Sequence, residues 1–200
     1  QSKATASVIV EEVTTRDESG AVIGAGSKQG AQGQLSSDGP PTTHSGNGTD
    51  RLMFFQGGLN RDTTHFVNGT PVGARDIFNV AQSVGLGSAF PIYNRFSAEC
   101  TRFIQLGPEH KKRNTPPPVL VTHAKAGTIV GNCASYDAFT LGGPHSCRGY
   151  NVGELGAARS FLEYAAEIRV PIPKLDTHAF AFWERCTDLG SSASVPGNPT

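Results

Sequence analysis

The sequence predicts an all-β, antiparallel fold, and two patterns carry this prediction. Apolar and polar residues alternate with a period of two over several stretches of about ten residues, as in strands whose two faces meet different surroundings. The connections between them are long and rich in turn residues, since the chain holds 24 Gly and 13 Pro among 200 residues. No apolar run approaches the roughly 20 residues that a membrane helix needs, which excludes a helical membrane protein.

About seven strands are expected, and most exceed the roughly five or six residues typical of soluble sheets. They are, in chain order, Thr5–Val13, Leu52–Val67, Ile77–Leu86, Phe96–Leu106, Val119–Val130, Phe161–Ile172 and Ala179–Cys186. The apolar face of the fourth is interrupted by Arg102, and the polar face of the fifth carries His123 and Lys125. In the last, Phe180 and Phe182 lie opposite two alanines.

The clearest alternation lies in Phe161–Ile172. Its apolar face is formed by Leu162, Tyr164, Ala166, Ile168, Val170 and Ile172. The opposite face carries Glu163, Glu167 and Arg169. An amphipathic helix is the alternative, because Leu, Ala and Glu are good helix formers. The clean alternation through the Ile-Arg-Val-Pro stretch at its end favours a strand.

The length of the connections bears on the kind of β fold. Residues 20–48 have the composition of a flexible, solvated loop, and residues 131–156 form another long insertion. Long alternating strands with loops of unequal length are typical of transmembrane β-barrels. A soluble β-sandwich gives the same alternation with shorter strands, so the pattern alone leaves both folds open.

Composition and motif spacing exclude several functions. Lys+Arg and Asp+Glu both total 17, and this balance argues against a general nucleic-acid binder. The glycine-rich stretch 24–30 fits neither phosphate-binding spacing, and the six histidines show no metal-pair spacing. His145-Ser146-Cys147 gives no triad geometry, and the four widely spaced cysteines indicate neither a disulfide framework nor a zinc ribbon. We therefore expect no enzyme activity, no metal and no cofactor.

The stretch Phe139–Tyr150, FTLGGPHSCRGY, is a glycine-rich loop with one cation, Arg148. It resembles the LGGxxSxRGY signature loop of the superfamily of outer-membrane protein insertases and two-partner secretion transporters. The matching positions are Gly142, Gly143, Ser146, Arg148, Gly149 and Tyr150. Two further motifs follow in the order of that superfamily: Glu167–Pro171 resembles ExRxP, and Phe182–Cys186 resembles FxDxG. Cys147 and Cys186 depart from it, standing where the superfamily has Val and Gly.

Other stretches are similar to the chloroplast branch of this superfamily, the barrel subunits of the protein-import translocon of the outer envelope. They include FVNGTPVGARDIFNV, PPPVLV and RGYNVGELGAARSFLEYAAEIRVPI, and the likeness runs from about Asp50 onwards. The resemblance implies a 16-stranded antiparallel barrel in the chloroplast outer envelope that conducts unfolded preproteins with transit peptides. It implies GTPase receptors and membrane lipid as partners. About seven strands cannot close such a barrel, so we expect residues 1–200 to form part of one barrel domain.

The resemblance also implies a site. In the superfamily the loop, here 131–156, folds into the barrel lumen, where its Arg meets acidic groups of the wall. An Arg in a confined lumen needs a carboxylate partner. We expect Glu184 as the partner of Arg148 and Glu167 as the second choice, with Glu163, Arg169, His123 and Lys125 also facing the lumen. Two alternatives stay open: the paralogous insertase of the same membrane, and a soluble β-sandwich binding module.

Overall fold

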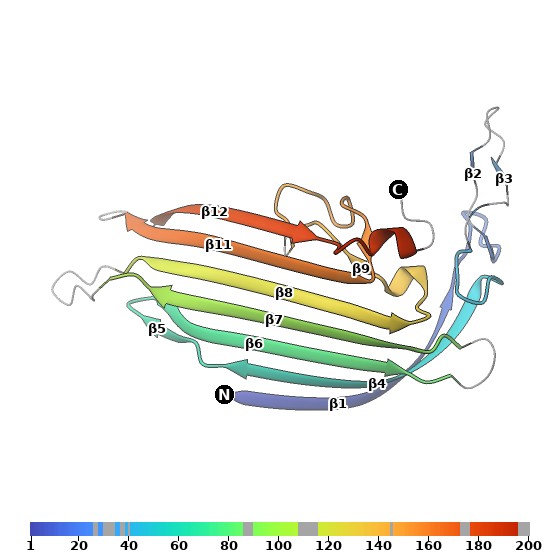
Figure 1. The fold of residues 1–200 in the computed structure, drawn as a ribbon, viewed down its shortest axis with the longest axis horizontal. Coiled ribbons are helices and arrows are strands. Elements are labelled where there is room, and N and C mark those ends of the chain that lie inside the picture. Colours follow the sequence, from blue (N-terminus) through green and yellow to red (C-terminus); the bar gives the residue numbers. More distant parts are fainter. Residues whose placement is uncertain are drawn as a thin grey trace.

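The computed structural model describes residues 1–25, 28–29, 35–36, 39, 41–85, 90–107, 116–144, 146–172 and 177–195. Their main feature is an antiparallel sheet of long strands that forms one curved layer (Figure 1). In spatial order these strands are β1 (Ser2–Thr14), β4 (Thr49–Asp62), β6 (Thr70–Ser83), β7 (Tyr93–Gln105), β8 (Val119–Gly131), β11 (Ser160–Ile172) and β12 (Thr177–Thr187). Each strand pairs with its neighbours in an antiparallel register, so the predicted all-β antiparallel class is confirmed.

The structure corrects two of the expected strands. The run Leu52–Val67 is not one strand: β4 ends at Asp62, and a short strand, β5 (His65–Val67), pairs with the start of β6. The chain turns between them because the backbone N–H of Thr64 donates to the Asp62 carboxylate at 2.8 Å. The strand expected at Ile77–Leu86 begins earlier, at Thr70, and ends at Ser83, whereas Leu86 lies outside the described residues.

The two faces of the sheet differ, as the alternation predicts. On β11, Leu162, Ile168 and Val170 are exposed, whereas Glu163 and Glu167 are buried on the opposite side. We call the face with Leu162 the outer face and the face with Glu163 the inner face. The outer face of the neighbouring strands is apolar as well: its exposed side chains include Val8, Phe55, Phe78, Val80 and Phe96.

Polar residues border this apolar outer face at both ends of the strands. Arg102, which interrupts the alternation of β7, bonds Asp76 of β6 at 2.5 Å, and Arg51 bonds Glu12 at 2.9 Å near the other end. On β7 the polar residues Asn94 and Arg102 lie eight positions apart, which is about 26 Å along a strand. That spacing is similar to the apolar band of about 25 Å on membrane β-barrels, and exposed Ile104 continues the same face beyond Arg102.

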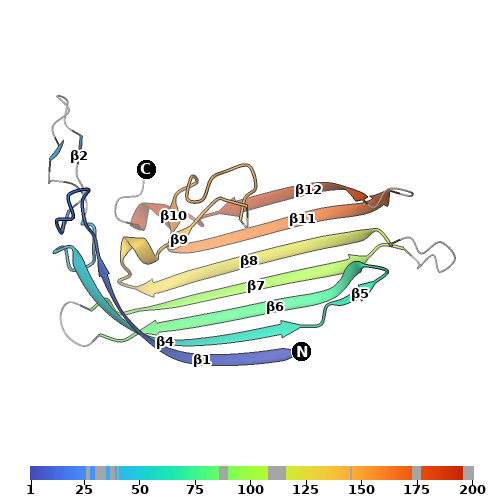
Figure 2. The same ribbon diagram turned by 180° about the vertical axis from the view of Figure 1, so that it is seen from behind.

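The connection between β8 and β11 covers part of the inner face. It contains a 3₁₀ turn, η1 (Ser135–Asp137), and a small antiparallel pair formed by β9 (Phe139–Thr140) and β10 (Ala157–Ala158) (Figure 2). A second 3₁₀ turn, η2 (Ser192–Ser194), follows β12. No helix in the described ranges is long and apolar enough to cross a membrane.

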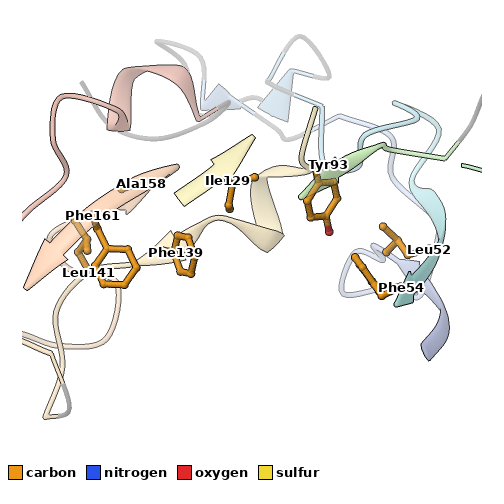
Figure 3. Close-up of a cluster of buried hydrophobic side chains, with 8 residues drawn as sticks. All are labelled: Leu52, Phe54, Tyr93, Ile129, Phe139, Leu141, Ala158 and Phe161. Carbon is orange, nitrogen blue, oxygen red and sulfur yellow. The ribbon is translucent and has the colours of Figure 1, made fainter. Parts of the chain in front are cut away.

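The buried core lies between the inner face and this connection. Figure 3 shows its side chains as a row across the sheet, composed of Leu52, Phe54, Tyr93, Ile129, Phe139, Leu141, Ala158 and Phe161. The only other paired strands in the described part are the two-residue pairs β9–β10 and β2 (Lys28–Gln29)–β3 (Leu35–Ser36). A second large sheet, which a β-sandwich would need, is therefore not present in this part of the chain.

The loop expected over residues 20–48 falls partly outside the described residues. Its described end is attached to the sheet: Thr43 is buried, and its hydroxyl accepts the backbone N–H of Gly48 at 3.0 Å. The hydroxyl of Thr42 donates to the carbonyl of Ile23 at 2.6 Å. Composition alone did not indicate this ordered end.

Candidate functional site

The signature loop, residues 131–156, turns sharply at its double glycine. Gly142 and Gly143 have φ of +98° and +107°, in the left-handed region that favours glycine. A Cβ at Gly142 would lie 2.7 Å from the carbonyl oxygen of Asn151, and one at Gly143 would lie 2.8 Å from a methyl group of Val152. The two glycines therefore let the loop fold back on itself in close backbone contact.

The loop is attached to the inner face through aromatic packing. The rings of Phe139 and Phe161 lie 4.7 Å apart, and the guanidinium of Arg95 lies 4.5 Å from the centroid of Phe139. Gly127 on β8 leaves the space for both rings, since a Cβ there would lie 2.6 Å from Phe161 and 2.7 Å from Phe139. The absence of a side chain at this position thus permits the docking of the loop.

The 3₁₀ turn at the start of the loop makes polar contacts with distant strands. The phenol of Tyr136 donates to the Asp50 carboxylate at 2.8 Å, and Tyr93 donates to Asp137. Asp50 is fully buried and also accepts the backbone N–H groups of His44 and Ser45. Burial, together with the hydrogen bond to Asp50, raises the pKa of Tyr136 above its ordinary value, so the phenol stays protonated and donates.

Arg148 lies between two inner-face carboxylates. Its backbone N–H donates to Glu184 at 2.8 Å, and its Nε–H donates to the other oxygen of the same carboxylate. Its Nη1 lies 2.9 Å from Glu167, whose second oxygen binds Nε of Arg169 at 2.5 Å. The guanidinium also lies 3.9 Å from the ring centroid of Phe182, a cation–π contact.

We call these five residues, Arg148, Glu167, Arg169, Phe182 and Glu184, the latch cluster. It contains two guanidinium groups and two carboxylates, so its charges balance. The Glu184 side chain is 10% exposed and that of Arg148 is 34% exposed, which places the ion pair at the border between a buried and a surface pair. Three consecutive structural units, namely the loop, β11 and β12, meet in this cluster.

A second contact holds the loop beside the latch cluster. The hydroxyl of Ser146 donates to Oε1 of Glu163 and accepts the backbone N–H of Gly142 at 3.2 Å. Glu163 is 3% exposed, and its Oε2 has no hydrogen-bond partner among the described residues. Lys125 compensates this charge in part, because its Nζ lies 4.0 Å from Oε2. The side chain of Lys125 also lies over the ring of Phe161.

The structure brings together most, but not all, of the residues that the sequence indicated. Arg148, Glu184, Glu167 and Arg169 meet in one cluster, and Ser146, Glu163 and Lys125 meet in another. His123 shares the inner face but bonds Thr101 at 3.0 Å instead. Gly149 and Tyr150 are exposed and contribute no side-chain hydrogen bond or ion pair to either cluster.

The contacts that the sequence did not indicate include the cation–π contact of Arg148 with Phe182, the hydrogen bond from Ser146 to Glu163, and the hydrogen bond from Tyr136 to Asp50. The partners in these contacts lie between 17 and 86 residues apart in the sequence. In the described part of the chain, no group of three His, Cys, Asp or Glu side chains could hold a metal ion.

Comparisons with known proteins agree with this architecture. The model of the Omp85 superfamily domain matches residues 2–200. Protein TOC75, chloroplastic, of Pisum sativum is 54% identical over the whole chain, and TOC75-3 of Arabidopsis thaliana is 53% identical. The chain spans about a quarter of the length of these relatives, 25% and 24% respectively.

A solved structure shows the same fold. BamA from Haemophilus ducreyi, lacking POTRA domains 1–3, superposes with a TM-score of 0.58 at 14% identity, over 80% of this chain and 32% of that one. This confirms the predicted β-barrel fold, and the chloroplast relatives confirm the predicted location in the plastid outer envelope as an integral β-barrel. With an antiparallel sheet of seven long strands, a signature loop on the inner face of that sheet and a family match along its whole length, the chain belongs to the Omp85 superfamily.

Proposed function

We propose that this chain is a segment of a channel that conducts unfolded preproteins across the chloroplast outer envelope. The observation that carries the proposal is the latch cluster, in which Arg148 of the signature loop binds Glu184 and Glu167 of the sheet. The resemblance of the loop and of the flanking motifs to import channels supports it, as does identity of 54% with a TOC75 protein along the chain. Because the chain spans a quarter of that relative, the conducting unit is the full protein.

In this proposal the outer face meets lipid and the inner face lines the lumen. The apolar outer face with polar residues at both ends supports the first assignment, because the lipid-facing side of a membrane barrel has this composition. Glu163, Glu167, Arg169, His123 and Lys125 support the second. Among the described residues, the edge strands β1 and β12 each have a long partner strand on one side only. Lipid does not tolerate unpaired backbone groups, so further strands pair with both edges in the closed barrel.

The signature loop acts as an internal latch in this channel. A loop bound to the wall by ion pairs narrows the lumen. Because the side chains of Arg148 and Arg169 are partly exposed, water can compete for these ion pairs. The loop can therefore change its contacts without loss of the wall. No catalytic step and no cofactor enter this role. Transit peptides and GTPase receptors are the partners that the resemblance implies.

Charge reversal tests the latch in the full-length protein in outer-envelope membranes. Arg148→Glu places a third carboxylate beside Glu184 and Glu167, so import of a preprotein should fall sharply. Adding Glu184→Arg restores an ion pair of opposite polarity and should recover part of the import. The recovery stays partial, because an Arg at 184 cannot accept the backbone N–H of residue 148.

Arg16→Glu is the matched control, since it makes the same charge change at an exposed position outside the long strands. Import by this variant should equal that of the unmodified protein. A double variant no better than Arg148→Glu alone would contradict the latch. If the Arg148→Glu variant imports normally but fails to assemble newly made β-barrel proteins, the insertase function replaces the import function.

A further inference from the structure

Two cysteines, one in the signature loop and one in the sheet, face each other where the loop lies on the sheet. Cys147 lies in the loop between Ser146 and Arg148, and Cys186 lies near the end of β12. Both are free cysteines. Cys147 is 8% exposed, whereas Cys186 is half-buried at the edge of the core cluster. Neither takes part in the latch cluster or in the contact between Ser146 and Glu163.

The contacts on both sides of Cys147 place it over Cys186. Ser146, the preceding residue, bonds Glu163, and Glu163 lies opposite Cys186 in the register of β11 and β12. Arg148, the following residue, bonds Glu184 through its backbone N–H. Glu184 precedes Cys186 by two positions, so their side chains share the inner face of β12.

The surroundings of the four cysteines also indicate that Cys147 and Cys186 are neighbours. Cys147 is the side chain nearest in effect to the thiol of Cys186, so the two thiol groups lie close together. The other two cysteines are placed differently: Cys100 lies on the outer face of β7, where it neighbours Asp76, and Cys133 packs against the core cluster at the start of the loop. Geometry therefore selects one pair out of four cysteines.

We propose that Cys147 and Cys186 form a thiol oxidation site, at which a small-molecule disulfide of the glutathione class links the signature loop covalently to β12. The small deprotonated fraction of Cys186, the more accessible of the two thiols, attacks one sulfur of the small disulfide and releases one thiolate. The thiolate of Cys147 then attacks the sulfur of Cys186 in this mixed disulfide and releases the second. Two protein thiols become one disulfide, and the oxidant leaves as two thiols that carry the two protons.

Oxidation of this site would replace a non-covalent attachment of the loop by a covalent one. The ion pairs of the latch cluster exchange with water and weaken in salt, whereas a disulfide holds the same two structural units until it is reduced. Oxidation therefore fixes the loop on the inner face, and reduction releases it to the control of the ion pairs. The inference does not depend on which substrate passes through the barrel.

Disulfide mapping tests the site in the full-length protein in outer-envelope membranes. Oxidised glutathione is added, remaining thiols are alkylated in denaturant, and tryptic peptides are analysed by mass spectrometry. The peptide 126–148 carries both Cys133 and Cys147, so the mapping is repeated in a Cys133→Ala background to assign the bond. We expect a peptide that links residues 147 and 186, at least tenfold more abundant than any other linked pair, and its loss on treatment with dithiothreitol.

Single variants separate the pair from chance oxidation. Cys147→Val or Cys186→Ala should abolish the linked peptide, whereas Cys100→Ala should leave its yield unchanged. The unmodified protein gives the primary result, so the test does not depend on the folding of any variant. If both thiols are alkylated after oxidation, or if glutathione stays attached to Cys186 without transfer to Cys147, the site is disproved.

Discussion

Glu184 binds Arg148 at two points, because one carboxylate accepts both the backbone N–H and the Nε–H of the same residue. A side chain that binds backbone and guanidinium together fixes the path of the loop as well as the direction of the Arg. Glu184→Gln keeps the shape but removes the charge. We expect a loss of about 1–3 kcal/mol in the free energy of unfolding, between the values for surface and buried pairs.

The measurement is urea unfolding of the full-length protein in lipid vesicles, with the rate of tryptic cleavage after Arg148 as a local readout. Glu12→Gln is the matched control, since the exposed pair of Glu12 and Arg51 should be worth about 1 kcal/mol or less. Equal losses for the two variants would contradict the special role of Glu184.

Gly127 should be sensitive to a single methyl group. In Gly127→Ala the Cβ meets the rings of Phe161 and Phe139, so we expect a loss of about 1–3 kcal/mol from overpacking and a faster proteolysis of the loop. Gly57→Ala on β4 is the control, because its Cβ meets only a methyl group of Val80 at 3.4 Å. The same unfolding measurement compares them, and a neutral Gly127→Ala would show that the rings are not held against β8.

Ser146 and Glu163 should be energetically coupled. Ser146→Ala leaves a buried carboxylate without its hydroxyl donor, and its second oxygen already lacks a hydrogen-bond partner among the described residues, so a loss of about 1–3 kcal/mol is expected. Glu163→Gln in the same chain removes the charge of this buried carboxylate. A double-mutant cycle should therefore show that the double variant loses less than the two single losses combined. Strict additivity would contradict the contact.

A new charge should destabilise the protein more on the outer face of β8 than on its inner face. Ala124 is exposed on the outer face, and its neighbour His123 lies on the inner face. Ala124→Arg should cost about 2–4 kcal/mol in lipid vesicles if the residue lies near the middle of the bilayer. His123→Arg should cost little, since His123 bonds the polar side chain of Thr101 and shares its face of β8 with Lys125. Equal costs in the unfolding measurement would contradict the assignment of the outer face to lipid.

The strands could be predicted because a period of two is a local property of each segment. Alternation placed Glu163 and Glu167 on the face opposite Leu162, and the structure agrees. The break after Asp62 was missed because a short polar turn does not disturb the apolar pattern on either side of it. Strand ends depend on such turns, so their positions were the least accurate part of the prediction.

The latch cluster was predictable only in part. The resemblance indicated that Arg148 meets carboxylates, and alternation from Phe182 placed Glu184 on the same side of its strand. The contact of Arg148 with Phe182 depends on where along β12 the loop lies. A local sequence pattern does not predict that position. Likewise, Tyr136 and Asp50 lie 86 residues apart, and only the register of the intervening strands brings them together.

The bond between Tyr136 and Asp50 has a consequence for the order of assembly. It joins the turn after β8 to β4, and β6 and β7 lie between these two strands in the sheet. Its acceptor is therefore in place only after three successive strand pairings have formed. Contacts between residues so distant in sequence form late, because the intervening chain must first be ordered. Docking of the turn thus shows that β4, β6, β7 and β8 have paired. A protease that cuts only the undocked loop would measure when this step occurs during membrane insertion.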